Sequence, residues 1–234
     1  MNILVIIPAF NEEDNISKLI KNIRKVEFRN NVDILVVNDQ SSDMTSYICK
    51  KLGVNVIDLP CNLGIGGAVQ TGYKFASLNN YDIAIQVDGD GQHNPEFLEK
   101  LIEPIVKGNS DMVIGSRYIE HNGFQSSTLR RVGIRYLKFL INSLSGLKIT
   151  DPTSGFRACN KKLIQTFAMN YPRDYPEPES IMYIKRKGFS VSEVPVVMNE
   201  REGGTSSINF HRSIYYMIKV SLAIFFDKIR KESL

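Results

Sequence analysis

The chain has 234 residues, of which 43% are hydrophobic and 23% are charged, and its formal net charge is +4 at pH 7. This composition is typical of a globular protein with a buried core and excludes a disordered or collagen-like chain. The modest positive charge suits an anionic ligand or a membrane surface. A nucleic-acid-binding protein usually concentrates its basic residues in one stripe, so we expect no nucleic-acid partner.

Three cysteines, Cys49, Cys61 and Cys159, are widely spaced and fit neither a zinc motif nor a disulfide framework. We therefore expect reduced thiols in a cytoplasmic protein. Met1 and Asn2 lead directly into an apolar run without a basic leader, so no signal peptide is expected. No stretch holds the roughly 20 consecutive apolar residues that a membrane-spanning helix needs.

The first half of the sequence alternates between short apolar runs and amphipathic segments. This alternation, with strands that are apolar at nearly every position, predicts an α/β fold with a doubly wound, mostly parallel sheet flanked by helices. The first helix is predicted to carry acids in its first turn, Ser41 and Ser42 to cap the second, and Pro95 to begin the fourth. The predicted strands are 2–8, 32–39, 54–59, 81–87 and 111–116, and the predicted helices are 11–26, 41–52, 66–78 and 95–107.

The pattern changes after residue 116. No internal repeat or low-complexity linker is present, which favours one domain, 1–207, followed by a C-terminal amphipathic helical extension at 208–234. The predicted segments are a basic, mostly helical stretch at 117–150, a turn-rich stretch at 151–160, a short helix at 179–188, a strand at 189–198, a glycine-serine loop at 199–210 and a last helix at 213–233.

Polar residues stand where several predicted strands end. The carboxyl ends of parallel strands meet at one edge of the sheet, and ligands bind beyond that edge. These side chains are therefore expected to share one crevice. They are Asn11 and Glu12, Asn38 and Asp39, Asp88 and Asp90, and Ser116 and Arg117.

Two acids, Asp88 and Asp90, stand one residue apart in "QVDGDGQHNP", directly after a predicted buried strand. Half-buried neighbouring acids repel one another unless a cation joins them. Mg²⁺ and Mn²⁺ prefer oxygen ligands and bridge to phosphates, so the pair, with Gln92, is interpreted as a metal site shared with a diphosphate. Gly89 allows close approach of the backbone. A solvated turn and a general acid/base dyad are the alternatives, and His93 is interpreted as a structural neighbour.

Seven stretches resemble the motifs of a known family. "IPAFNEEDNI", "VVNDQSSDMT", "NLGIGGAVQTGYKFA" and "QVDGDGQHNP" resemble, in this order, motifs of the family 2 glycosyltransferases, which have the GT-A fold. "DPTSGFRACN", "EPESIMYIKRKG" and "EVPVVMNEREGGTSSI" resemble the polyprenyl-phosphate sugar transferases, whose best-known branch is the dolichol-phosphate mannose synthases. The resemblance runs from residue 3 to about residue 210.

The resemblance implies a reaction. A sugar would pass with inversion from a UDP- or GDP-linked donor to undecaprenyl or dolichyl phosphate, with Mg²⁺ or Mn²⁺ as cofactor, for cell-envelope glycan or glycoconjugate synthesis. A phosphomonoester has a second pKa of about 6, so it arrives as an anion and needs no strong base. It does need cations to hold it, and the leaving diphosphate needs its charge neutralised.

The resemblance also implies roles for single residues on the donor side. Asp39 is expected to hydrogen-bond the base, while Asn38 stands where the family usually has another acid. Arg201 is expected to reach the diphosphate from the loop before Gly204, Ser206 and Ser207. The implied metal ligands are Asp88, Asp90 and Gln92, and the implied nucleotide-sugar contacts are Pro8, Ala9, Asn11, Glu12, Asp39, Asp88, Gly89, Asp90 and Arg201.

On the acceptor side, Arg117 and Arg131 are expected to hold the lipid phosphate, with Arg130 or Arg135 as substitutes for Arg131. Asp151 is expected to cap a turn before Pro152. The glycines of "NLGIGG" are expected to allow tight helix-sheet packing rather than to cradle a phosphate, because Ile65 stands where many relatives have a basic residue. The implied catalytic residues are Asp90, Arg117, Arg131, Ser154 and Glu179. The basic helix could instead present its arginines to solvent, and Glu179 could be a helix N-terminal acid.

The apolar run at 213–226 would cover about 21 Å as a helix, short of the ~30 Å hydrocarbon core. We expect it to lie at a membrane interface, with Tyr215 and Tyr216 at the headgroups and Lys219, Lys228, Arg230 and Lys231 near anionic lipids. The expected location is peripheral, on the cytoplasmic face of the membrane, with a separate small membrane-anchoring protein as a hypothesised partner. The alternative is a helix packed on its own domain or in a homo-oligomer.

Three other functions remain open at this point. The same fold and donor would serve a saccharide or protein acceptor, although the arginines and the apolar tail argue against it. A non-catalytic nucleotide-sugar-binding scaffold subunit is disfavoured by intact Asp88, Asp90 and Arg201. A nucleotidyltransferase usually begins with a glycine-rich, basic loop after its first strand, whereas this chain has the acidic "PAFNEED".

Overall fold

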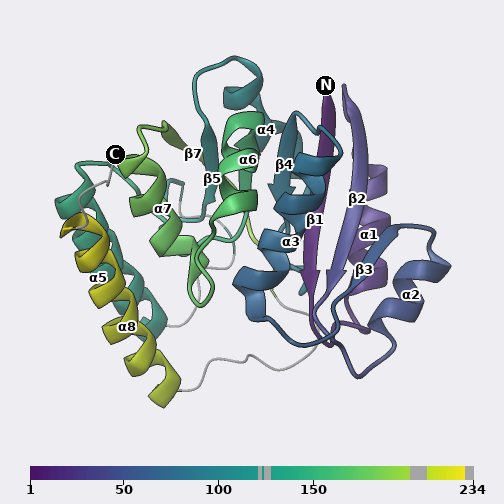
Figure 1. Cartoon of the computed structure of the whole chain (residues 1–234), viewed down its shortest axis with the longest axis horizontal. Coiled ribbons are helices and arrows are strands. Elements are labelled where there is room, and N and C mark those ends of the chain that lie inside the picture. Colours follow the sequence, from purple (N-terminus) through teal and green to yellow (C-terminus); the bar gives the residue numbers. More distant parts are fainter. Residues whose placement is uncertain (121–122, 124–127, 201–209, 230–234) are drawn as a thin grey trace.

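The computed structural model describes residues 1–120, 123, 128–200 and 210–229. In this part of the chain one seven-stranded sheet has the order β3-β2-β1-β4-β6-β5-β7, and β6 is antiparallel to both of its neighbours (Figure 1). The predicted α/β fold with a mostly parallel sheet is confirmed. The strands are β1 (Asn2–Ala9), β2 (Asn31–Asn38), β3 (Asn55–Asp58), β4 (Ile83–Gln86), β5 (Met112–Ser116), β6 (Arg157–Asn160) and β7 (Val191–Pro195).

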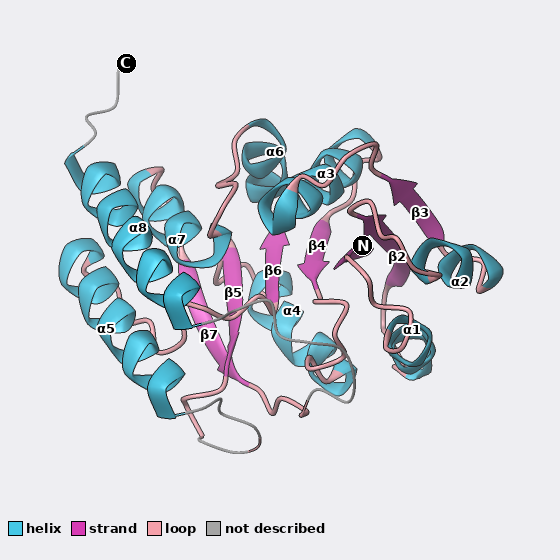
Figure 2. Ribbon diagram, turned by 90° about the horizontal axis from the view of Figure 1, so that it is seen from below, coloured by secondary structure: helices cyan, strands magenta, loops and turns pink. Residues whose placement is uncertain are grey.

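Helices cover both faces of the sheet (Figure 2). One face carries α1 (Ile16–Lys25), α2 (Thr45–Lys51) and α4 (Leu98–Val106), the last preceded by a 3-10 turn at Pro95–Phe97. The other carries α3 (Gly64–Leu78) and α6 (Lys161–Met169), followed by α5 (Thr128–Ser145), α7 (Pro176–Arg186) and α8 (Phe210–Ile229). The doubly wound arrangement is therefore present. Pro95, predicted to begin the fourth helix, begins the 3-10 turn before it, and α4 itself begins at Leu98.

Strand β1 shows why the central strands are apolar at every position. Leu4 and Ile6 belong to the core under α3 and α6, while Ile3, Val5 and Ile7 belong to the core under α1 and α4. Successive side chains of a strand point to opposite faces, so a strand covered on both sides must be apolar throughout.

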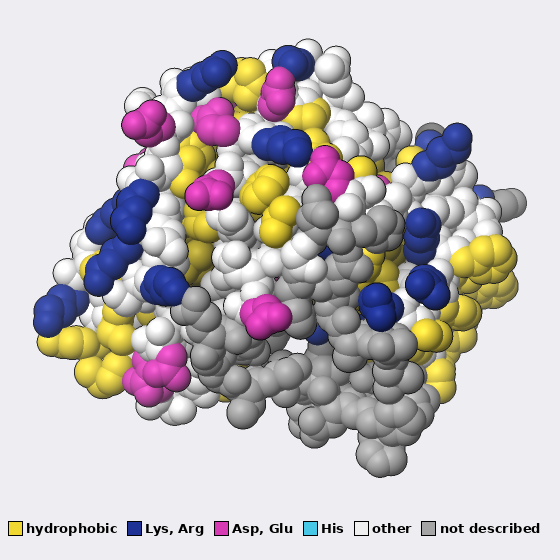
Figure 3. Space-filling view, turned by 180° about the vertical axis from the view of Figure 1, so that it is seen from behind, with side chains coloured by type: hydrophobic (Ala, Val, Ile, Leu, Met, Phe, Trp, Pro, Cys, Tyr) yellow, Lys and Arg dark blue, Asp and Glu magenta, His cyan; other side chains and the backbone are white. Residues whose placement is uncertain are grey.

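Helix α8 packs between α5 and α7, yet its outer face is apolar. Arg186 on α7 pairs with Asp227 at 2.8 Å, and Lys228 donates to the Leu144 carbonyl of α5 at 2.7 Å. Figure 3 shows hydrophobic side chains gathered along the edge that α5 and α8 form, with Lys and Arg beside them. Exposed apolar residues are Tyr215, Ile218, Leu222, Phe225, Phe226 and Ile229 on α8, and Val132, Tyr136 and Phe139 on α5. None of the described helices is both long and apolar enough to cross a membrane.

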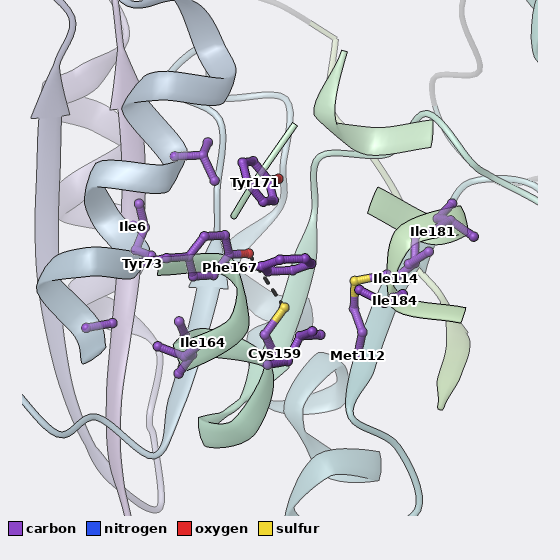
Figure 4. Packing of buried hydrophobic residues seen from close by; sticks show 14 of the residues in the cluster. Ile6, Tyr73, Met112, Ile114, Cys159, Ile164, Phe167, Tyr171, Ile181 and Ile184 are labelled. Carbon is purple, nitrogen blue, oxygen red and sulfur yellow. Dashed lines mark hydrogen bonds between the residues drawn. The ribbon is translucent and has the colours of Figure 1, made fainter. Parts of the chain in front are cut away.

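The core under α3 is built on aromatic side chains (Figure 4). Tyr73 is fully buried, lies 5.1 Å from Phe167 between ring centroids, and its hydroxyl is 3.5 Å from Cys159 Sγ. A Cβ added at Gly72 would lie 2.3 Å from a methyl of Ile6, so this glycine lets α3 approach β1. The predicted helix-sheet role of the "NLGIGG" glycines is wrong, because Gly66 packs instead on the main chain of residues 172–173.

Two predicted helix starts are wrong. Helix α1 begins at Ile16, so the acids expected in its first turn precede the helix. Helix α2 begins at Thr45 without a serine cap. Ser41 Oγ instead accepts from the Asn11 N–H at 2.9 Å, and the Ser42 N–H donates to Asn11 Oδ1 at 2.8 Å. The serines therefore join the loop after β2 to the loop after β1.

The region after residue 150 departs most from the sequence prediction. Within the supposedly turn-rich stretch 151–160, Arg157–Asn160 form β6 in the middle of the sheet. Helix α6 was not expected, α7 begins three residues before the predicted position 179, and β7 ends at Pro195. Strand β6 is only four residues long and contains a buried arginine, so it lacks the apolar pattern that marks the other central strands.

Candidate active site

The loop after β1 and the acidic turn after β4 lie against each other at the carboxyl edge of the sheet. The parallel register of β1 and β4 brings these loops together. A Cβ added at Gly89 would lie 3.1 Å from the Pro8 carbonyl oxygen, 3.3 Å from Glu12 Cγ and 3.5 Å from Ala9 Cβ. Gly89 thus allows the Asp88–Asp90 turn to rest on the first loop.

Asp39 connects three loops. It is buried, and its backbone N–H donates to the Ala9 carbonyl at 2.9 Å. Its Oδ1 accepts from the Leu63 N–H at 2.7 Å and its Oδ2 from the Gly64 N–H at 2.9 Å. The carboxylate therefore fixes the start of α3 beside the first loop. Asn38 donates to Asp58 Oδ1 at 2.8 Å.

Asp88 is held from two sides. Gln86 Nε2 donates to Asp88 Oδ1 at 3.2 Å, and the Asp88 backbone N–H donates to His93 Nδ1 at 3.0 Å. Because Nδ1 accepts, the neutral His93 ring carries its proton on Nε2, which lies 3.6 Å from Asp88 Oδ2. His93 is 3% exposed and stacks on Phe156 with ring centroids 4.8 Å apart. His93 thus helps to fix the conformation of the acidic turn.

Asp90 and Gln92 complete the turn. Asp90 Oδ1 accepts from the Gln92 N–H at 3.1 Å, and the Gln92 carbonyl accepts from the Asn199 N–H at 2.9 Å. The second bond ties the turn to the segment after β7.

Asp88, Asp90 and Gln92 suit a divalent cation only if a bound ligand supplies the remaining coordinating oxygens. Among the described residues, no group of three or more His, Cys, Asp or Glu side chains could hold a metal by itself. A Cβ at Gly155 would lie 2.7 Å from Asp88 Oδ2, so glycine keeps the space beside this carboxylate open. Two carboxylates and an open flank suit Mg²⁺ or Mn²⁺, which take their remaining oxygens from phosphate and water.

Arg117 lies at the end of β5 in a buried ion pair with Asp151. Its Nε donates to Asp151 Oδ2 at 2.6 Å and its Nη2 to Oδ1 at 2.7 Å, and Nη2 also donates to Thr153 Oγ1 at 3.0 Å. The expected turn contact of Asp151 is present, since Thr153 Oγ1 donates to its Oδ1 at 3.2 Å. Sequence reasoning missed that its main partner is Arg117.

Arg117, Arg130 and Arg131 form a basic cluster whose charges act on Tyr118. Burial raises the pKa of Tyr118, and the positive charges of these three arginines oppose that rise. The Arg117 guanidinium lies over the Tyr118 ring, 5.4 Å from its centroid. Arg131 Nε is buried without a hydrogen-bond partner in the part of the chain that the structure describes. Arg135 is exposed on α5. Of the candidate arginines on α5, Arg130 and Arg131 lower the pKa of Tyr118, the residue that follows Arg117.

Ser154 shapes the turn that presents Gly155 to Asp88. It is 1% exposed, its Oγ accepts from the Phe156 N–H at 3.2 Å, and its carbonyl accepts from Arg157 Nε at 2.6 Å. These two hydrogen bonds fix the conformation of the turn.

Glu179 faces α8. It lines a cavity of about 670 Å³ with Tyr183, Arg186 and Asp227 among its walls. Burial, together with the charge of Asp174, raises the pKa of Glu179 to about 7.

Glu177 is the acid of α7 that approaches the acidic turn. Burial raises its pKa, the charge of Asp88 adds to the rise, and a hydrogen bond with Gln86 opposes it. Two residues on a helix differ by about 200° in direction, so only one acid of "EPE" reaches the turn. The sequence carried no signal that distinguishes Glu177 from Glu179. Arg201, with Gly204, Ser206 and Ser207, lies outside the described residues.

Comparisons with known proteins show the family of the chain and its fold. Residues 4–167 match the model of glycosyl transferase family 2. A UDP-N-acetylglucosamine–dolichyl-phosphate N-acetylglucosaminyltransferase of Methanococcus voltae is 32% identical over 214 residues, covering 83% of this chain and 84% of the relative. A polyprenol monophosphomannose synthase of Mycolicibacterium smegmatis is 30% identical over 232 residues, covering 93% and 85%.

Among solved structures, the glucosyl-3-phosphoglycerate synthase from Mycobacterium tuberculosis in complex with Mn²⁺, UDP and phosphoglyceric acid superimposes with a TM-score of 0.75. It is 19% identical and is covered to 80%, against 99% of this chain. The fold and the loops gathered at its carboxyl edge define a glycosyltransferase with the GT-A fold, as the resemblance implied. The chain belongs to glycosyl transferase family 2.

Proposed function

We propose that this protein transfers a sugar, with inversion, from a nucleotide-sugar to an undecaprenyl or dolichyl phosphate at the cytoplasmic face of a membrane, as a step in making cell-envelope glycans or glycoconjugates. One observation carries the proposal. Arg117 is paired with Asp151 in the turn that presents Gly155 to Asp88, and Arg130 and Arg131 stand on α5, which shares an exposed apolar face with α8. An amphipathic acceptor with a phosphate head and an apolar tail matches this combination of basic and apolar groups. The relatives named for dolichyl and polyprenol substrates support it.

On the donor side, Asp88, Asp90 and Gln92 would hold Mg²⁺ or Mn²⁺. The cation would neutralise the diphosphate of the donor and of the departing nucleoside diphosphate. Asp39 would contact the base through lone pairs that Leu63 and Gly64 leave available. The first loop, with Pro8, Ala9, Asn11, Glu12 and Gly89, would line the nucleotide, and Arg201 would approach the diphosphate.

On the acceptor side, the lipid phosphate carries its own negative charge near pH 7 and needs no base. A phosphate oxygen would form the new bond to the anomeric carbon as the bond from that carbon to the diphosphate oxygen breaks. Arg131, whose buried Nε has no partner among the described residues, and Arg130 would hold this phosphate. Arg117 would contribute charge while Asp151 holds it against the turn of Ser154. We assign Glu179 no contact with the reacting groups, because it faces α8.

The helical extension of 208–234 would place the catalytic domain, 1–207, on the lipid surface. Between residues 215 and 229 the exposed side of α8 is mostly apolar, and α5 extends this surface. Lys228 and Lys219 flank it and suit anionic headgroups. Interfacial binding of this face would hold Arg130 and Arg131, which stand on α5, close to the lipid headgroups. Attachment through a small membrane protein or a second copy would be alternative uses of the same face.

A donor screen tests the proposed function. Purified protein would be incubated with UDP-glucose, UDP-N-acetylglucosamine or GDP-mannose, with undecaprenyl or dolichyl phosphate in liposomes, and with Mn²⁺ or Mg²⁺. We expect one donor to yield a glycolipid by mass spectrometry, and Asp90→Asn to yield none while remaining folded. Absence of glycolipid with every donor, or transfer to a free saccharide alone, would show that the acceptor is a different one.

A further inference from the structure

Gln86 lies directly behind the acidic turn. It is the last residue of β4, is fully buried, and pairs in register with Arg157 of β6. Its Nε2 lies 3.2 Å from Asp88 Oδ1, and its side chain also hydrogen-bonds to Glu177. Gln86 is therefore a neutral side chain between two carboxyl groups.

The surroundings of Gln86 determine which end of its amide faces them. A carboxylate only accepts hydrogen bonds, whereas an amide nitrogen has two donors. Turning the carbonyl oxygen toward Asp88 would place its partial negative charge against the Asp88 carboxylate. The NH₂ end therefore faces Asp88, and Oε1 is left buried without a partner among the described residues.

The unpartnered Oε1 weakens a purely structural explanation of Gln86. A buried acceptor without a hydrogen bond destabilises a fold, and an apolar side chain of similar length would fill the same space without that penalty. What an apolar side chain would not supply is the donor to Asp88 Oδ1. The amide thus costs stability and gives Asp88 a fixed hydrogen bond.

Arg157 reinforces the same arrangement from the other strand. It is 1% exposed and donates to the Ser154 carbonyl at 2.6 Å, the Pro152 carbonyl at 3.1 Å and Ser180 Oγ at 2.8 Å. These bonds join the 152–155 turn to α7 behind the acids. A Cβ added at Gly155 of that turn would lie 2.7 Å from Asp88 Oδ2 and 2.9 Å from Oδ1. The Asp88 carboxylate is therefore hydrogen-bonded by Gln86 and bounded by Gly155.

We propose that Gln86 is a positioning residue that holds the Asp88 carboxylate in one orientation before the divalent cation and diphosphate bind. The inference rests on the proposed function, in which Asp88 is a metal ligand. Partners that orient a metal ligand typically change metal affinity by about 10- to 100-fold when removed. Gln86 would act in this way although it does not touch the metal.

The test uses Gln86→Met, which keeps the length of the side chain and removes the donor. Binding of Mn²⁺ to the full chain in saturating UDP would be followed by the loss of the free Mn²⁺ electron paramagnetic resonance signal. We expect Mn²⁺ to bind about 10-fold more weakly, with a melting temperature equal to or above that of the wild type. A merely structural glutamine would lower the melting temperature and leave Mn²⁺ affinity unchanged.

Gln70→Met is the matched control. Gln70 also donates through Nε2, to the carbonyls of Phe167 and Ala168 at 3.5 and 3.4 Å, on α3 and away from the acids. This variant should bind Mn²⁺ like the wild type. Gln86→Leu is a second apolar variant that also removes the donor, for use if methionine packs poorly at this position. If neither Gln86 variant folds, the residue is structural and the proposal is wrong.

Asp88→Asn separates this inference from the proposed function. If Asp88→Asn binds Mn²⁺ as tightly as the wild type does, Asp88 is not a metal ligand. The proposed positioning role of Gln86 is then refuted as well. If Asp88→Asn loses Mn²⁺ binding while Gln86→Met retains wild-type affinity, the metal site stands and only the role of Gln86 is refuted.

Discussion

Arg117 and Asp151 form a buried ion pair, with Nε 2.6 Å from Oδ2 and Nη2 2.7 Å from Oδ1. Asp151 is fully buried and Arg117 is 6% exposed. The pair joins the end of β5 to the turn that carries Ser154 and Gly155. The guanidinium that the family resemblance assigns to the acceptor phosphate is thus already engaged, and it fixes the turn that faces the acidic pair.

Asp151→Asn should therefore destabilise the protein. Removing one partner leaves the buried Arg117 charge uncompensated, which typically costs about 3–5 kcal/mol of unfolding free energy. Urea denaturation followed by circular dichroism measures this loss. Glu103→Gln is the control, because it breaks the exposed Glu103–Lys107 pair on the surface of α4 and should change little. Equal losses in the two variants would contradict a special role for the buried pair.

Gly155→Ala should reduce turnover without unfolding the protein. The added Cβ would lie 2.7 and 2.9 Å from the Asp88 oxygens, so the carboxylate must move. A displacement of about 1 Å at a reacting centre can reduce the rate about 100-fold. The measurement is kcat for glycolipid formation, with circular dichroism to show folding. Gly133→Ala on α5, where the nearest atom is Met217 Sδ at 3.4 Å, should retain full activity.

Glu179 should make stability depend on pH. Burial and the charges of Asp174, Asp227 and Glu177 raise its pKa from 4.5 to about 7, against a smaller opposing effect of Lys219. The folded state therefore binds the proton more tightly than the unfolded state. The stabilisation is fully present below about pH 4.5 and is lost as pH rises through about 7.

Glu179→Gln provides the measurement, because glutamine cannot ionise. The difference in unfolding free energy between wild type and variant should fall with rising pH across this window and then level off. A difference that stays constant between pH 4 and pH 8 would show that the carboxyl is not perturbed in the folded protein.

The apolar face of α8 should control binding to lipid. Ile218→Glu combined with Phe225→Glu places two charges on exposed positions, so the fold should keep its melting temperature. Flotation with liposomes containing anionic lipid should fall sharply relative to wild type. Leu78→Glu is the control, because Leu78 is an exposed apolar residue on α3, away from this face. Unchanged flotation of the double variant would assign the face to a protein contact instead.

The sequence predicts the first half of the fold well because the signals there are strong. Strands such as β1 are apolar at every position, and the intervening helices have a clear amphipathic period. The failures come from tertiary context. Strand β6 holds Arg157 in the core, where the guanidinium donates to the Ser154 and Pro152 carbonyls and to Ser180. No local sequence pattern predicts a buried arginine in a central strand.

The sequence predicts where the candidate site lies, but it does not predict which residues contact one another there. Strand ends indicated one edge of the sheet, and the structure brings Gly89 against Pro8 and Glu12 there. The pairing of Arg117 with Asp151 depends on a contact between segments 34 residues apart. The choice between Glu177 and Glu179 depends on the rotation of α7, which begins three residues earlier than its sequence suggests.

Strand β6 also determines when the site can form during synthesis. Residues 157–160 fill the gap between β4 and β5, so a nascent chain that has released only the acidic turn from the ribosome has one edge of β4 without its partner. Unpaired strand edges promote misassembly while a chain is still incomplete. Because the turn before β6 supplies Gly155 and Asp151, fragments that end before residue 151 lack both the neighbour of Asp88 and the partner of Arg117. Partial translation products should therefore depend on chaperones and show no transferase activity of their own.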